Sequence, residues 1–209
     1  MTRPRDAAVV CQAAAILLQY PDDALHQRLP LVAAAVRTLP PGPARTGLTA
    51  LLDHIAATKP RELAEHYVAL LDRRRRCCLY LTWWADGETR RRGQALAALK
   101  DRYRRAGLEL DGRELPDHLP VVLEYAATGD LADGLALLQE HRAGIELLRL
   151  ALCEARSPYA GAAQAVCSLL PGPSPKDRAA ARRLARTGPP TESVGLTPYP
   201  TARTGGGPR

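Results

Sequence analysis

The chain has 209 residues, which suits one domain better than two and is long enough to bury most of its apolar surface. Alanine and leucine dominate while phenylalanine is absent, which favours helices over strands because Ala and Leu lose little freedom in a helix. A formal net charge of +7 suits a nucleic acid, an anionic membrane surface or only a solvated basic face. No apolar run approaches the roughly 20 residues that cross a bilayer, so we expect a cytoplasmic protein without stable membrane insertion.

Helices in the first half of the chain are predicted from apolar spacing and from the positions of prolines. Side chains recur at helical intervals over residues 6–20, 22–39, 46–57 and 60–71. Asp22 can cap the second of these segments, and Pro30 should kink or split it. Residues 40–43 are expected to form a linker, and Pro60 suits a first helical turn.

Residues 73–93 combine more charge and aromatic surface than an ordinary core segment holds. In order, they contain four arginines, Cys77 and Cys78, the aromatic residues Tyr80, Trp83 and Trp84, an acidic turn and a second arginine block. We expect that a partner outside the chain, or a special surface within it, uses this segment.

The charge changes sign after a further helix that should end near Gly107. Between residues 109 and 140 there are eight acidic residues and one arginine. Here Asp117 and His118 lie between two prolines, where Asp117 could cap a helix that has Pro120 in its first turn. Either Asp117 is only that cap, or the carboxylate and the imidazole are held at an exposed helix start for a partner.

The later segments are also predicted to be helical. Helices are expected from Asp130 and over residues 145–152. Two more should start at Ser157 and Ser174, where each serine would cap a helix that has proline in its first turn. The sequence therefore predicts an all-α protein with one globular body of about eight helices over residues 1–186. A loosely ordered tail rich in proline and glycine should follow over residues 187–209, because it has too few apolar residues to fold alone.

Catalysis and metal binding have little support in the sequence. Cys77 or Cys78 could act as a thiolate beside the arginines, but neither a nucleophile signature nor a phosphate-binding glycine loop accompanies them. Adjacent cysteines on a helix point about 100 degrees apart, which suits buried small side chains better than a metal site. His54 and His66 lack a partner at His-x-x-x-His spacing, so we interpret them as surface histidines. We expect no enzymatic activity, no metal site and no cofactor.

Two binding functions remain. In one, the arginine blocks contact phosphates while Tyr80, Trp83 and Trp84 stack on the bases of a nucleic acid. Salt-sensitive binding to a generic oligonucleotide would distinguish this function. In the other, an aromatic groove with acidic surroundings binds the apolar face of a basic amphipathic peptide.

Two stretches, RRRRCCLYLTWWADGETRRRGQALAALKDRYRRAGLEL and ELPDHLPVVLEYAA, resemble the NarJ-type nitrate reductase assembly chaperones, within the wider TorD-like group of molybdoenzyme chaperones. The closing PPTESVGLTPY segment is similar to the end of the same family. The chain departs from the family pattern at residues 67–76, which lack a Phe-Asp element before the cysteines. It departs again at Trp83 and Trp84, which replace paired tyrosines.

The resemblance implies an all-helical chaperone without enzymatic activity that binds the N-terminal segment of the nitrate reductase catalytic (alpha) subunit until the molybdenum cofactor is inserted. The candidate peptide-binding residues are Tyr80, Trp83, Trp84, Asp86, Glu88, Asp117, His118 and Glu124. The carboxylates would pair with cationic side chains of the peptide, and His118 would make binding depend on pH near ~6.5. We expect no nucleic-acid partner, and either a monomer or a dimer.

Overall fold

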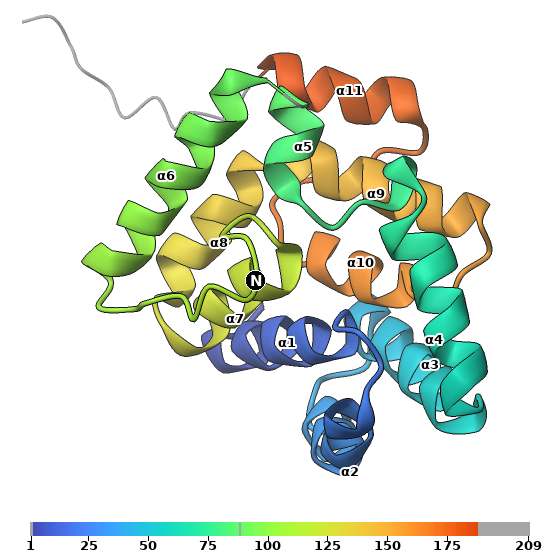
Figure 1. The fold of residues 1–209 in the computed structure, drawn as a ribbon. Coiled ribbons are helices and arrows are strands. Elements are labelled where there is room, and N and C mark those ends of the chain that lie inside the picture. The colour runs from blue at the N-terminus through green and yellow to red at the C-terminus, as the bar shows by residue number, and fades with distance from the viewer. Residues whose placement is uncertain (1, 88, 188–209) are drawn as a thin grey trace, which may run out of the picture.

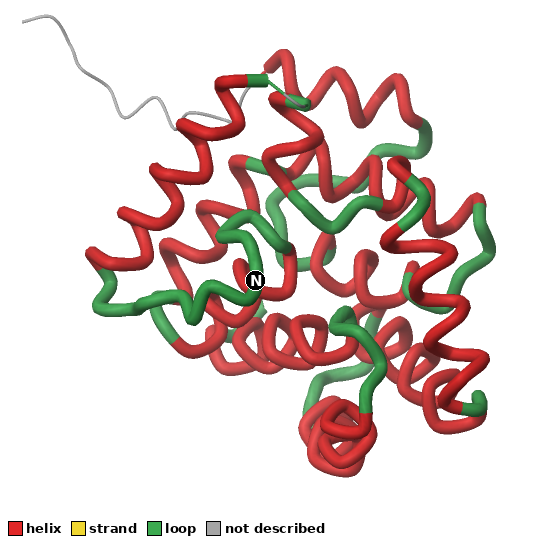
Figure 2. The backbone as a smooth tube through the Cα atoms, viewed as in Figure 1, coloured by secondary structure: helices red, strands yellow, loops and turns green. Residues whose placement is uncertain are grey.

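The computed structural model describes residues 2–87 and 89–187, with side chains up to residue 184. These residues form eleven α-helices and no β-strand (Figures 1 and 2). The helices are α1 (Pro4–Leu17), α2 (Asp23–Arg37), α3 (Pro43–Ala57), α4 (Pro60–Tyr67), α5 (Leu81–Asp86), α6 (Arg90–Arg105), α7 (Leu119–Thr128), α8 (Leu131–Glu140), α9 (Arg142–Glu154), α10 (Ala160–Cys167) and α11 (Arg178–Thr187). The all-α prediction is confirmed. None of the described helices is long and apolar enough to span a membrane.

Helix α1 is the centre of the packing. It contacts α7 most extensively and also packs against α2, α3 and α10 (Figure 1), and its residues from Val10 to Leu17 are buried except for Gln12. Helices α3 and α10 approach closely because Gly47 and Gly161 face each other. A Cβ atom added to Gly47 would lie 2.5 Å from the carbonyl oxygen of Gly161, so a larger residue there would push the helices apart.

Caps and prolines set most of the helix starts. The Asp22 carboxylate accepts a hydrogen bond of 2.8 Å from the backbone N–H of Leu25, as expected for the cap of α2. Pro30 lies inside this helix without splitting it. The expected linker at residues 40–43 is one residue shorter, since Pro43 already begins α3. The side chain of Asp130 caps α8, accepting from Asp133 N at 2.9 Å.

Two predicted caps are wrong. The N-cap position of α7 is His118, and no side chain caps that helix, so Asp117 does not have the expected role there. Ser174 does not cap α11 either, because its hydroxyl donates to Glu146 Oε1 at 2.7 Å. The carboxylate of Asp177 accepts from Ala180 N at 2.7 Å instead, and α11 begins directly after it.

The structure tests the prediction for two histidines but not the prediction for the tail. His54 and His66 are half-buried rather than on the surface, and their ring centroids lie 5.9 Å apart. The expected loosely ordered tail falls almost entirely on residues 188–209, which lie outside the described residues. The boundary proposed between the helical body and this tail stays a prediction.

Candidate functional site

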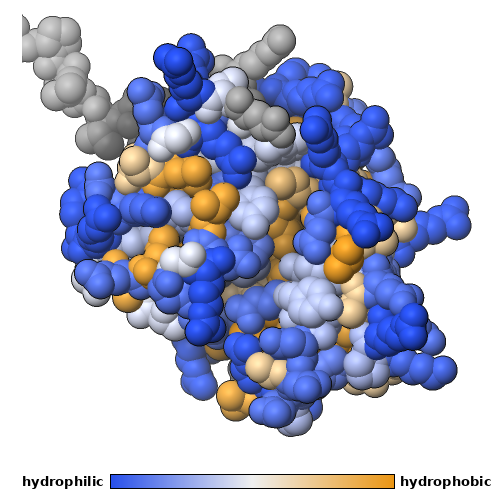
Figure 3. Space-filling view, viewed as in Figure 1, coloured by the Kyte–Doolittle hydropathy of each residue, from blue (hydrophilic) through white to orange (hydrophobic). Residues whose placement is uncertain are grey.

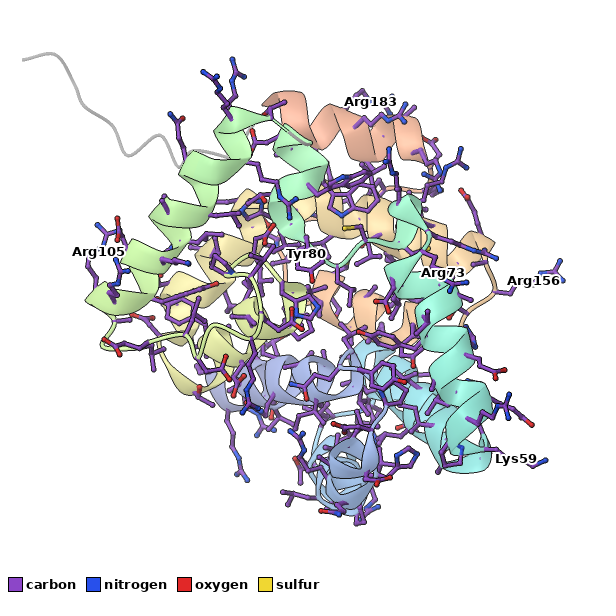
Figure 4. All side chains as sticks on the ribbon, viewed as in Figure 1. Lys59, Arg73, Tyr80, Arg105, Arg156 and Arg183 are labelled. Carbon is purple, nitrogen blue, oxygen red and sulfur yellow. The ribbon has the colours of Figure 1, made fainter. Side chains whose placement is uncertain are left out.

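Two segments that are distant in sequence meet on the face shown in Figure 4, where Tyr80 is labelled near the centre. The backbone N–H of Leu81 donates to the carbonyl oxygen of Asp117 at 2.9 Å. Tyr80 and His118 thereby form an isolated antiparallel bridge. The structure thus brings the aromatic stretch and the Asp-His pair together.

Asp117 lies beneath this bridge and is fully buried, with 0% exposure. Its Oδ2 atom accepts hydrogen bonds from the backbone N–H of Thr82 at 3.1 Å and from the Thr82 hydroxyl at 2.5 Å. The Arg92 guanidinium lies 3.8 Å from the same oxygen. The expectation that Asp117 lies at an exposed helix start is therefore wrong, because its carboxylate is turned inward to cap the short helix α5.

His118 and Tyr80 form the polar centre of the site. Their ring centroids lie 5.1 Å apart, and Glu114 Oε2 lies 3.5 Å from His118 Nδ1 and 3.4 Å from the Tyr80 hydroxyl, which donates to it. Burial lowers the pKa of His118, although the carboxylates of Glu114, Asp117 and Asp72 oppose this shift. Burial and the Glu114 carboxylate raise the pKa of Tyr80 to about 12. Burial thus favours the neutral form of the imidazole, which lies next to a protonated phenol.

A cavity of about 1060 Å³ opens above this pair, and we call it the central groove. Its aromatic lining residues are Tyr20, Tyr67, Tyr80, Trp83, Tyr103 and Tyr125, and its carboxylates are Asp22, Asp72, Glu109, Asp111, Glu114 and Glu124. Its arginines are Arg28, Arg74, Arg75 and Arg113. Figure 3 shows orange side chains exposed between blue ones on this face. The groove therefore combines aromatic surface with an excess of carboxylates, although the whole chain is basic.

Only some of the predicted site residues line the central groove. Tyr80, Trp83, His118 and Glu124 all line the central groove. Trp84 does not: its indole Nε1 donates to the carbonyl oxygen of Cys78 at 3.1 Å, and its ring packs against Gly144 of α9.

Asp86 and Glu88 are the remaining predicted residues of the peptide-binding set. Asp86 is half-buried at the end of α5 and is not among the lining residues. Glu88 lies outside the described residues.

Asp72 and Glu114 line the groove but were not among the predicted site residues. Asp72 ends a π-helical turn, Val68–Asp72, in which Arg73 N donates to Val68 O at 3.1 Å. Burial raises the pKa of Asp72, and the charge of Glu114 raises it further. Glu114 could have been predicted from the sequence, because it belongs to the acidic segment between residues 109 and 140. No sequence feature indicates Asp72, because a π-helical turn continues an α-helical apolar pattern without a visible break.

Nucleophilic and metal chemistry find no support at this site. Burial raises the pKa of both Cys77 and Cys78, which keeps them as thiols, the less reactive form. Within the described part of the chain, no three His, Cys, Asp or Glu side chains are grouped as metal ligands.

Comparison with known proteins decides the family. A sequence profile described as nitrate reductase delta subunit matches residues 40–164. This chain belongs to the nitrate reductase delta subunit family. The matched residues include every lining residue of the central groove except those from residues 19–28, so the groove lies mainly within the family region.

Curated relatives agree with this assignment. The chain is 30% identical over 155 residues to the nitrate reductase molybdenum cofactor assembly chaperone NarJ of Bacillus subtilis, covering 74% of this chain and 84% of the relative. It is 38% identical over 147 residues to NarJ of Escherichia coli K12, covering 69% and 62%. It is 39% identical over 159 residues to the nitrate reductase-like protein NarX of Mycobacterium tuberculosis, covering 76% of this chain but 24% of NarX.

The fold has a counterpart among solved structures. A crystal structure of a candidate redox enzyme maturation protein from Archaeoglobus fulgidus superposes with a TM-score of 0.58 at 20% identity, covering 80% of this chain and 94% of that chain. This likeness concerns the fold alone. The resemblance inferred from the sequence is confirmed at the level of the delta subunit family, and the NarJ relatives are named as assembly chaperones rather than enzymes.

Proposed function

We propose that this delta subunit family member is a cytoplasmic maturation chaperone for a nitrate reductase. In this proposal it binds a basic amphipathic segment at the N-terminus of the catalytic (alpha) subunit and assists insertion of the molybdenum cofactor. Support comes from the relatives in Bacillus subtilis and Escherichia coli, which are named as nitrate reductase molybdenum cofactor assembly chaperones.

The observation that carries the proposal is the composition of the central groove. The groove has a volume of about 1060 Å³ and is lined by six aromatic side chains and six carboxylates. This local concentration of carboxylates contrasts with the formal net charge of +7 of the whole chain. An amphipathic helix buries its apolar face in such a groove. Carboxylates at the rim give charge-assisted hydrogen bonds to Lys or Arg of the same helix.

Binding proceeds without covalent chemistry. The apolar face of the client segment lies against Tyr80 and Trp83, while its cations meet Glu114 and Glu124 at the rim. Asp117 acts from below, because its carboxylate holds the start of α5 and hence the position of the aromatic stretch. Occupation of the segment by the chaperone delays assembly of the subunit until the cofactor is in place.

The maturation claim is tested in cells that lack this chain. Nitrate reductase purified from such cells should contain less molybdenum per catalytic subunit than enzyme from complemented cells, at equal amounts of polypeptide. Complementation with the intact chain should restore the metal content, and a variant with Tyr80→Ala and Trp83→Ala should restore it less. Equal molybdenum content with and without the chain would contradict the proposal.

A further inference from the structure

A second cavity lies on the other side of Trp83, between α5, α9 and α11. Its volume is about 330 Å³, near the lower end of the range of small-molecule pockets, about 300–1,000 Å³. In Figure 1, α11 runs beside α9 close to α5. The lining residues that matter here are Arg76, Trp83, Trp84, Gly144, Arg178 and Arg182, and we call this cavity the arginine pocket.

The floor of the arginine pocket is rigid. The indole of Trp84 is fixed by its hydrogen bond of 3.1 Å to the carbonyl oxygen of Cys78. Its ring reaches α9 only because residue 144 is glycine, since an added Cβ atom there would lie 2.8 Å from the Cβ of Trp84. Trp83 stands edge-on to Trp84 with ring centroids 5.1 Å apart. The two indoles thus form a preset aromatic corner.

The wall formed by α11 is also fixed. Arg142 of α9 donates to the carbonyl oxygens of Gly172 and Pro173 at 3.0 and 2.9 Å. Ser174 donates to the fully buried Glu146, and Arg178 forms an ion pair of 2.8 Å with Glu154. These contacts hold the segment before α11 and the first turn of that helix against α9, so the pocket is part of the folded body.

The charge of the arginine pocket is opposite to that of the central groove. Three arginines line it and no carboxylate does. Arg178 is engaged by Glu154, and the charge of Arg76 also lowers the pKa of that carboxylate. Arg76 and Arg182 are both exposed. Two guanidinium groups are thus available beside an aromatic corner. Guanidinium groups bind phosphate with paired hydrogen bonds, and indole faces stack on planar rings.

We propose that the arginine pocket binds a small ligand that carries a phosphate on a planar heteroaromatic framework, as mononucleotides do. The ring lies against Trp83 and the phosphate between Arg76 and Arg182. Trp83 lines both cavities. Arg76 and Arg182 line only the arginine pocket, so substituting them tests this site separately from the proposed function. Arg178 and Arg182 also follow residue 164, where the match to the delta subunit family ends.

Fluorescence gives a direct test, since Trp83 and Trp84 are the two tryptophans of the chain. The probes are adenosine and guanosine 5′-monophosphate, the two nucleosides, and inorganic phosphate, each titrated into the full chain. We expect saturable quenching by at least one monophosphate, and at least tenfold weaker binding of its nucleoside and of phosphate alone. Calorimetry with the same probe checks that the quenching reports binding.

Variants locate the site. Arg76→Ala combined with Arg182→Ala should weaken binding of the monophosphate at least tenfold, and Arg182→Lys should weaken it less because the charge remains. Arg61→Ala is the matched control, since Arg61 is exposed on α4 away from the pocket. All substituted side chains are exposed, so folding should persist, and circular dichroism checks this.

Three results would overturn the proposal. The first is the absence of saturable binding by either monophosphate at millimolar concentration. The second is an equal loss in the Arg61→Ala control, which would indicate nonspecific attraction to a basic surface. The third is affinity that appears only with oligonucleotides and grows with their length, which would indicate a nucleic-acid surface instead.

Discussion

The buried carboxylate of Asp117 should be a major source of stability for the junction that carries Tyr80 and His118. Replacing Asp117 by Ala removes the acceptor that caps α5, which costs about 0.5–2 kcal/mol in helices generally. It also leaves the Thr82 hydroxyl without its acceptor, which adds about 1–3 kcal/mol for a buried polar group. Because part of this cost is shared, we expect a loss of about 2–4 kcal/mol in the free energy of unfolding.

Urea unfolding followed by tryptophan fluorescence is the appropriate assay, because both indoles lie on the helix that Asp117 caps. Asp130→Ala is a matched control: it removes an exposed cap with one hydrogen bond, at 2.9 Å, and should cost about 1 kcal/mol. Thr82→Val combined with Asp117→Ala should show a coupling energy of about 1 kcal/mol or more. A loss below about 0.5 kcal/mol for Asp117→Ala at an unchanged denaturant slope would refute the assigned role of this carboxylate.

Three further outcomes are expected. The affinity for a cationic peptide should fall as the pH drops from ~6.5 toward the pKa of His118, which burial lowers. Calorimetry over a pH series below ~6.5 checks this, and His118→Gln should flatten the change. Gly134→Ala should destabilise the chain by about 1–3 kcal/mol, because the new Cβ would collide with the backbone of Ala126. Gly93→Ala meets no atom within 4 Å and should stabilise α6 by up to about 1 kcal/mol; thermal unfolding distinguishes the two. Arg102→Ala removes the hydrogen bonds of 2.7 and 2.8 Å to the Asp133 carboxylate. Amide hydrogen exchange should therefore become faster in α6 by a larger factor than in α1. An equal increase in both helices would contradict the role of this contact.

The pH dependence of stability has the same origin. The unfolded chain protonates His118 near its ordinary pKa of ~6.5, whereas burial lowers the pKa in the folded chain. The stability that neutral His118 contributes is therefore complete above about pH 6.5 and is lost as the pH falls toward the lowered value. Burial also lowers the pKa of His66 and of His141, so the three histidines act in the same direction.

Helix positions followed from the sequence wherever a local device sets them. Pro60 and the capping carboxylates of Asp22 and Asp130 act within one helical turn, and their effect is visible in a short window of residues. The start of α5 could not be predicted from such a short window. Its start depends on Asp117, which is 35 residues away in sequence.

The site was predictable in outline but not in its division of roles. Trp83 and Trp84 are neighbours with the same chemistry, yet Trp83 lines the central groove while Trp84 packs on α9. That difference depends on Gly144 in a distant helix. Similarly, Asp117 and His118 were predicted to bind the peptide together. The antiparallel bridge instead turns Asp117 inward and leaves His118 at the groove. Alternation of this kind appears only once the pairing partner is known.

The central claim is that the carboxylates of the central groove bind a cationic segment of the catalytic subunit. Calorimetric titration of a synthetic peptide from the N-terminus of that subunit tests it most directly, with the intact chain, with Glu114→Gln combined with Glu124→Gln, and with Glu62→Gln. Glu62 is an exposed carboxylate on α4 outside the groove. We expect one peptide per chain, affinity at least tenfold weaker in the double variant, and no change in the Glu62 variant. No binding to the intact chain, or equal affinity for all three proteins, would contradict the claim.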